Sequence, residues 1–300
     1  MTPEIFAMQA FNGLSLFTVL VLMALGLSIV FGLMGVINMA HGELMAMGAY
    51  ATYATAALFQ RLFPSLMGIY FLVGIAFAFA VTFAFGYLLE RGLIRFLYKR
   101  PLDTMLATWG LGLILQQLFR SIFGPREVGV PTEKWLEGAW KLSEGISLPL
   151  SRIFIIVLTI AVSSLVYLLL FRSRWGLRIR AVTQNRAMSG AAGINTARVD
   201  AVTFAFGCGL AGIAGSSFTM LASTGPTTGQ QYIVDTFVVV VFGGVDSLLG
   251  TFFSAFLIAQ QQSGLELFLT GSMAKAGMLM LVIAVLYVRP NGLFAMRVRR

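Results

Sequence analysis

FNGLSLFTVLVLMALGLSIVFGLMGVI, residues Phe11–Ile37, contains no charged side chain and is almost continuously apolar. It exceeds the roughly 20 residues that a helix needs to cross about 30 Å of hydrocarbon. Further apolar runs follow it, separated by polar or turn residues: Leu44–Phe59, Gly68–Leu89, Thr104–Ile122, Ile153–Phe171, Ala201–Ala222, Tyr232–Val245, Leu249–Leu267 and Met273–Val288. The pattern predicts an all-α polytopic transmembrane helical bundle of about eight or nine spans, with broken or re-entrant segments near Asn38 and Asp246.

The composition supports a membrane protein. Of the 300 residues, 58% are hydrophobic and only 11% are charged, and the mean hydropathy is +0.87. A water-soluble domain could not cover such a chain with polar surface. The net charge of +9 comes from short clusters between apolar runs, so no nucleic-acid partner is expected. We expect a single transmembrane domain over residues 1–300.

The basic clusters predict the orientation. They contain Arg91, Arg95, Lys99 and Arg100; Arg172, Arg174, Arg178, Arg180, Arg186 and Arg198; and Arg289, Arg297, Arg299 and Arg300. Positive charge collects on the cytoplasmic side, so residues 172–200 should form a cytoplasmic loop. The loop over residues 123–150 lacks this excess and should lie outside. A multi-pass protein of the cell (inner) membrane is predicted, with its N-terminus outside and its C-terminus in the cytoplasm.

Polar residues between the first two apolar runs are candidates for a solute pathway. Asn38, His41 and Glu43 follow each other with almost no loop, and His41 is the only histidine. Backbone at membrane depth is tolerated only where protein or a water-filled cavity satisfies it. One interpretation is a broken helix that borders the pathway, and the other is a short interfacial turn. Glu43 also suits the first turn of a helix, where a carboxylate complements the helix dipole.

Further polar groups lie within or beside later apolar runs. A second Gly- and Pro-containing break, Leu221–Gln231, precedes a run that contains Asp235. It either faces a polar cavity or forms an ordinary outer loop. The complete set of candidate pathway residues is Asn38, His41, Glu43, Gln116, Gln117, Thr224, Gln230 and Asp235.

The predicted cytoplasmic loop contains a short capped helix. Asn185 is a suitable N-cap, Ala187–Ala192 can form about two turns, and Gly193 can end the helix in a left-handed conformation. Such a helix buries little surface by itself. It is either a protrusion that fits a groove on a partner or a solvated basic loop.

Several motifs extend over the whole chain in a consistent order: Ile37–Glu43 with Met47–Tyr50, Leu177–Arg186, Arg198–Gly207, Gln231–Asp235 and Arg289–Phe294. In these motifs the sequence resembles the membrane-spanning permeases of ABC importers for branched-chain amino acids and related solutes, most closely the urea importer permease. The resemblance implies a second, related permease subunit, two cytoplasmic ATP-binding subunits and an extracytoplasmic solute-binding protein. ATP hydrolysis would belong to the ATP-binding subunits, so this chain should not be an enzyme, and no cofactor or metal is expected.

In that family, Arg180–Ile194 corresponds to the element that couples to the ATPase. The candidate coupling residues are Arg178, Arg180, Gln184, Asn185, Arg186, Ala191, Gly193 and Ile194. The sequence departs from the family pattern at Asp246, where Gly-Gly-Val-Gly is usual.

The residues alone do not decide the solute. Amide and hydroxyl side chains suit neutral urea, whereas Glu43, Asp235 and broken helices suit a zwitterionic amino acid. On the resemblance, urea is the expected solute, and a branched-chain amino acid or related amide is the alternative. A passive solute channel is a further alternative, but it leaves the capped cytoplasmic helix without a role.

Overall fold

The computed structural model describes residues 3–98, 100–143, 146–290 and 292–294. Lys99, Asn291, Arg297, Arg299 and Arg300, which belong to the motifs and basic clusters above, lie outside this part. The helices are α1 (Pro3–Ser28), α2 (His41–Leu62), α3 (Tyr70–Gly92), α4 (Pro101–Phe123), α5 (Leu150–Arg172), α6 (Arg174–Gln184), α7 (Arg186–Ala191), α8 (Thr196–Phe218), α9 (Thr228–Gly243), α10 (Leu248–Leu265) and α11 (Gly271–Val288). A π-helical turn, Ile29–Leu33, extends α1, and 3₁₀ turns Pro64–Ile69 and Ile94–Phe96 flank α3.

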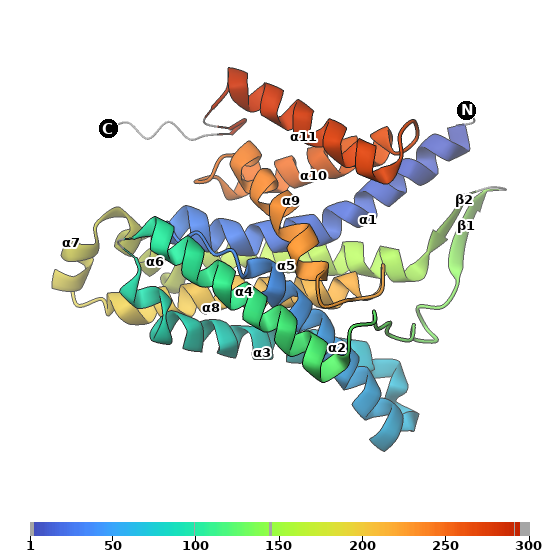
Figure 1. Cartoon of the computed structure of the whole chain (residues 1–300), viewed down its shortest axis with the longest axis horizontal. Coiled ribbons are helices and arrows are strands. Elements are labelled where there is room, and N and C mark those ends of the chain that lie inside the picture. Colours follow the sequence, from blue (N-terminus) through green and yellow to red (C-terminus); the bar gives the residue numbers. More distant parts are fainter. Residues whose placement is uncertain (1–2, 99, 144–145, 291, 295–300) are drawn as a thin grey trace.

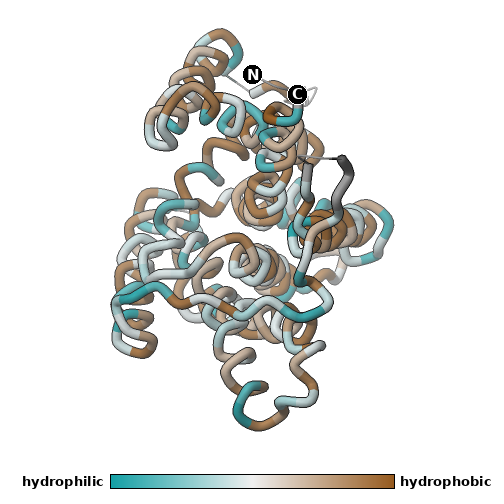
Figure 2. Tube along the Cα trace, turned by 90° about the vertical axis from the view of Figure 1, so that its right-hand side faces the viewer, coloured by the Kyte–Doolittle hydropathy of each residue, from teal (hydrophilic) through white to brown (hydrophobic). Residues whose placement is uncertain are grey.

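The helices form an elongated bundle whose two ends differ (Figure 1). One end holds α6 and α7 and is called here the arginine-rich end. The other, the hairpin end, holds the antiparallel strands β1 (Ala139–Ser143) and β2 (Ile146–Pro149). Apolar residues predominate on helices at the periphery as well as at the centre of the molecule (Figure 2). Such a periphery is expected where lipid is the solvent.

Each predicted apolar run coincides with one helix, which confirms the all-α polytopic fold. In the part of the chain that the structure describes, five helical segments are long and apolar enough to cross a membrane: Glu4–Leu33, Pro64–Phe96, Leu150–Arg172, Thr196–Phe218 and Gly271–Val288. Among these, α1 and α8 are the most buried, whereas α5 and α11 are largely exposed. The total of eight or nine crossings stays a prediction.

The chain breaks after α1, as the polar residues between the first two runs predict. Leu33 lies at the arginine-rich end, where its carbonyl accepts a hydrogen bond of 3.1 Å from Thr183 Oγ1 on α6. His41, the first residue of α2, instead contacts the Met23 carbonyl. Met23 precedes Leu33 by ten residues, so it lies roughly 15 Å further along the helix axis from the arginine-rich end. Residues 35–40 therefore return into the bundle without helical structure, and α2 begins in its buried interior.

Glycine allows the start of α2 to touch the start of α9. A Cβ atom added to Gly42 would lie 2.2 Å from the Gly229 carbonyl oxygen, and one added to Gly229 would lie 2.3 Å from the Gly42 oxygen. Real Cβ atoms do not approach so closely, so both positions need glycine. The first turns of two helices are thus held in backbone contact inside the bundle.

The segment before β1 is anchored to α3. Glu133 is 3% exposed, and its Oε1 accepts a hydrogen bond of 2.7 Å from the Phe71 backbone N–H. The Trp135 indole N–H donates to the other carboxylate oxygen. Burial raises the pKa of Glu133 above its ordinary value, partly opposed by these two hydrogen bonds.

Candidate solute pathway and coupling element

Asn38 organises the break between α1 and α2. It is fully buried and not helical, and its Oδ1 accepts a hydrogen bond of 3.1 Å from the Ala40 N–H. Next to it, the Met39 N–H donates to Thr108 Oγ1 of α4 at 3.0 Å. The Asn38 amide nitrogen has no hydrogen-bond partner among the described residues. The break therefore satisfies much of its backbone through side chains and retains one free amide donor.

His41 fixes the depth of α2. Its ring Nε2 donates to the Met23 carbonyl at 3.1 Å, and the residue is fully buried. Nδ1 has no partner within the described part of the chain. A donating Nε2 leaves Nδ1 of a neutral imidazole as an acceptor.

Glu43, Gln116 and Gln230 come together from α2, α4 and α9. Gln116 Nε2 donates to Glu43 Oε1 at 2.8 Å and lies 3.4 Å from Gln230 Oε1. Glu43 is 3% exposed, whereas Gln116 is half-buried and Gln230 is exposed. Glu43 Oε2 has no hydrogen-bond partner in the described residues. We call these three residues the polar cluster.

Two helix N-termini meet next to the polar cluster. Gly42 and Glu43 lie in the first turn of α2, and Gly229 and Gln230 lie in the first turn of α9. The first backbone N–H groups of a helix have no intrahelical acceptor, and the dipole places partial positive charge there. The cluster thus combines a carboxylate, two amides and converging helix N-termini, which can bind a small polar solute.

The remaining candidate pathway residues lie outside the polar cluster. Thr224 is buried, and its backbone forms an isolated bridge with Val128. Gln117 is exposed on α4. Asp235 forms an ion pair of 2.7 Å with Lys275 of α11, on a different side of α9.

The capped cytoplasmic helix of the sequence analysis is α7. Asn185 Oδ1 accepts a hydrogen bond of 2.9 Å from the Met188 N–H, which confirms the N-cap. At the other end, Gly193 has φ +82° and donates to the Gly190 carbonyl, and Ile194 donates to the Ser189 carbonyl. This pair of bonds is a Schellman motif, which requires a left-handed residue at Gly193. The helix begins and ends one residue earlier than predicted.

Arg186 connects α7 to the rest of the bundle. Its guanidinium pairs with Asp200 of α8 and lies 5.5 Å above the ring of Tyr98. The Tyr98 hydroxyl donates to Glu90 Oε1 at 2.8 Å near the end of α3. A continuous set of polar contacts therefore links α7 to α8 and α3.

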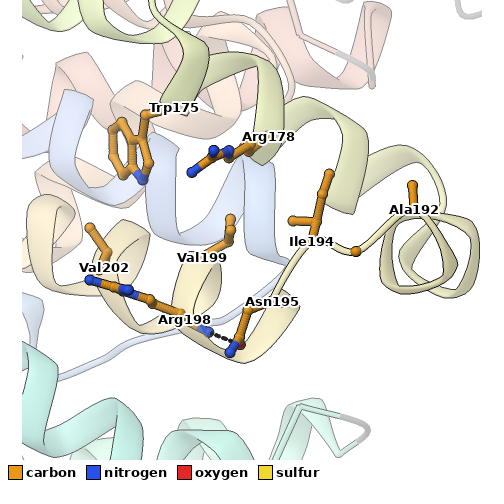
Figure 3. Close-up of a pocket in the computed structure, with 9 residues that line it drawn as sticks. Trp175, Arg178, Ala192, Ile194, Asn195, Arg198, Val199 and Val202 are labelled. Atoms are coloured by element: carbon orange, nitrogen blue, oxygen red, sulfur yellow. Dashed lines mark hydrogen bonds between the residues drawn. The ribbon is translucent and has the colours of Figure 1, made fainter.

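The other coupling candidates surround α7 or line a cavity beside it. Gln184, Asn185 and Ala191 are exposed, Ile194 is half-buried, and Arg180 donates to the Leu170 carbonyl. Arg178 lines a cavity of about 620 Å³, in which Trp175 and Arg178 of α6 face Arg198, Val199 and Val202 of α8 (Figure 3). Its aromatic and cationic lining can accept an acidic or amphipathic group.

Sequence reasoning did not identify Thr108, Lys275, Glu90, Tyr98 or Asp200. Lys275 offered a signal, because a lysine inside an apolar run needs a partner. Glu90 and Asp200 were acidic residues beside basic clusters. Their partners could not be chosen, since they come from segments far apart in the sequence.

The fold is that of a polytopic helical membrane protein with a broken helix inside the bundle. The model of the family described as "Branched-chain amino acid transport system / permease component" matches residues 9–287. The chain belongs to this family.

Curated relatives match over nearly the full length. The chain is 30% identical to the high-affinity branched-chain amino acid transport system permease protein BraD of Pseudomonas aeruginosa, covering 97% of both chains. It is 26% identical to LivH of Escherichia coli K12, which has the same description, over 96% of this chain and 95% of LivH. It is also 26% identical to a probable LivH of Methanocaldococcus jannaschii, over 91% of this chain and 88% of that relative. No solved structure matches.

These relatives favour the alternative solute over urea. All three are described as permeases for branched-chain amino acids, and none as a urea permease. The comparisons support the alternative of the sequence analysis and give no support to urea.

Proposed function

We propose that the chain is the membrane-spanning permease subunit of an ATP-driven importer of branched-chain amino acids. The observation that carries the proposal is the polar cluster beside the meeting helix N-termini, in a chain of this permease family. The free Glu43 oxygen would accept the substrate ammonium, and the N-termini of α2 and α9 would attract its carboxylate. Urea has neither charge, so it would use this arrangement less well.

A second, related permease would complete the pathway. Gln116 and Gln230 reach the open side of the cluster, and Gln117 is exposed on the same helix as Gln116. An amide that faces hydrocarbon costs several kcal/mol, so protein or a solvated path should cover this side. The partner permease would therefore pack against α4 and the start of α9.

The arginine-rich end would receive the ATP-binding subunits in the cytoplasm. The exposed α7, with Met188 66% exposed, and the cavity beside it supply a protrusion and a recess. The extracytoplasmic solute-binding protein would then approach the hairpin end, with the N-terminus outside. Reporter fusions after Asn185 and within residues 133–143 should read cytoplasmic and external, respectively, and a cytoplasmic second fusion would overturn this orientation.

Proteoliposomes that contain the complete transporter test the solute. With binding protein and ATP, labelled leucine should accumulate, excess isoleucine should compete, and excess urea should not. Omission of ATP is the control, and it should abolish accumulation. ATP-dependent uptake of urea without uptake of leucine would refute the proposed solute.

A further inference from the structure

A cleft lies between α5 and α10 on the side of the bundle. Its cavity of about 620 Å³ has Tyr167 and Phe171 of α5 on one wall and Leu249 and Phe253 of α10 on the other, with Leu33 among its lining residues. The volume is within the range of about 300–1,000 Å³ that is typical of small-molecule sites. We call this space the α5–α10 cleft.

The cleft extends from the arginine-rich end into the bundle. A second cavity, of about 60 Å³, shares Tyr167, Phe171 and Leu249 with it and reaches Leu25 and Ser163. Leu25 precedes Leu33 by roughly 12 Å of helix rise. The cleft is therefore a groove that runs parallel to α1. An acyl chain in the leaflet on this side of the membrane would lie in the same direction.

The walls of the cleft are apolar and exposed on the side of the bundle. Leu249 is 60% exposed, Phe253 50% and Tyr167 48%. These residues belong to apolar helices, and α5 is one of the segments able to cross a membrane. In a membrane, hydrocarbon would surround such exposed apolar helices, so an acyl chain would fill an apolar groove open to the side more favourably than water would.

The mouth of the cleft carries one cationic and one anionic side chain. Arg180 lines it, donates to the Leu170 carbonyl and lies 5.6 Å above the Phe171 ring. A guanidinium has five N–H donors, so several can still bind a phosphate. Asp246 also lines the mouth and is exposed. Within the described residues, no ion pair joins Arg180 to Asp246.

We propose that the α5–α10 cleft binds one phosphatidylethanolamine molecule of the bilayer, with its acyl chain between α5 and α10, its phosphate on Arg180 and its ammonium on Asp246. The charges select this headgroup. Phosphatidylglycerol has no cation for Asp246, and the quaternary ammonium of phosphatidylcholine has no N–H to donate. This site also gives a role to Asp246, where the sequence departs from the family pattern.

Lipid retention tests the site in the complete transporter. The complex is reconstituted into nanodiscs of equal phosphatidylethanolamine, phosphatidylglycerol and phosphatidylcholine, re-extracted in mild detergent, and its retained lipids are measured by mass spectrometry. Wild type should be enriched in phosphatidylethanolamine. Asp246→Asn should lower the ratio of phosphatidylethanolamine to phosphatidylglycerol about two- to fivefold, as expected for a partly exposed ion pair. Arg180→Gln should reduce retention of all three lipids.

Matched controls separate the cleft from general surface charge. Asp103→Asn and Arg95→Gln change exposed charges away from the cleft and should leave the lipid ratio unchanged. Leu249→Trp should displace the lipid while Arg180 and Asp246 remain.

A photoreactive residue identifies the occupant directly. Tyr167→p-benzoylphenylalanine should crosslink to phospholipid in the assembled complex. Equal retention of the three lipids by wild type, or crosslinking of position 167 to a protein subunit, would overturn the proposal. These readouts do not depend on which solute is transported.

Discussion

Glu43→Gln tests the role of the polar cluster. In the structure, the Gln116 amide nitrogen lies 2.8 Å from Glu43 Oε1. The substitution keeps the size of the side chain and an acceptor for this amide, but it removes the charge. A hydrogen bond to a charged group contributes about 1.5–3 kcal/mol, which corresponds to roughly 10- to 150-fold in affinity. If the substrate ammonium binds Glu43, leucine uptake at limiting concentration should fall by a factor in this range.

The assay is initial leucine uptake into proteoliposomes with saturating binding protein and ATP, normalised to assembled complex. Glu133→Gln is the matched control, because Glu133 is also 3% exposed and hydrogen-bonded but lies outside the proposed pathway. It should leave uptake by assembled complex unchanged. Wild-type uptake by Glu43→Gln would refute the proposed contact between Glu43 and the substrate.

Three further predictions concern other parts of the chain. Gly42→Val places side-chain atoms against the Gly229 carbonyl, only 2.2 Å from the added Cβ, so it should destabilise the protein by about 1–3 kcal/mol or more and lower the yield of folded chain in a detergent-stability assay. Gly193→Val should strain the left-handed cap by about 1–2 kcal/mol and reduce leucine-stimulated ATP hydrolysis while membrane insertion proceeds; normal stimulation would count against α7 as the coupling element. The pKa of Glu133 is raised in the folded protein, so between its ordinary and its raised pKa the folded state binds more protons than the unfolded state. The stability that this group contributes therefore falls as the pH rises through that range. Glu133→Gln should flatten the pH dependence of amide exchange at Phe71 over the same range.

The sequence was sufficient to predict the long apolar helices and the two caps of α7, but not α6 or the β1–β2 hairpin. Apolar runs define spans because lipid imposes one strong constraint, and caps such as Asn185 and Gly193 act over only a few residues. The depth of His41 and the meeting of Gly42 with Gly229 depend on contacts between distant segments, which hydropathy does not encode. The same reason explains why Asp235 could be identified as polar within a span, whereas its partner Lys275 could not.

The sequence alone could not identify the solute, for a different reason. Asn38, Gln116 and Gln230 can bind a neutral amide as well as part of an amino acid, so residue types alone left both possibilities open. The structure adds the meeting of two helix N-termini beside Glu43, which suits a zwitterion. The comparisons favour the same choice independently.

Accessibility of position 116 tests most directly whether a branched-chain amino acid passes the polar cluster. Gln116→Cys would be made in a Cys208→Ala background, since Cys208 is the single native cysteine. In the assembled transporter, a small water-soluble thiol reagent should label position 116, and leucine delivered by the binding protein with ATP should slow the labelling, whereas urea should not. Labelling that leucine leaves unchanged, in a variant that still transports leucine, would contradict a pathway along Glu43, Gln116 and Gln230.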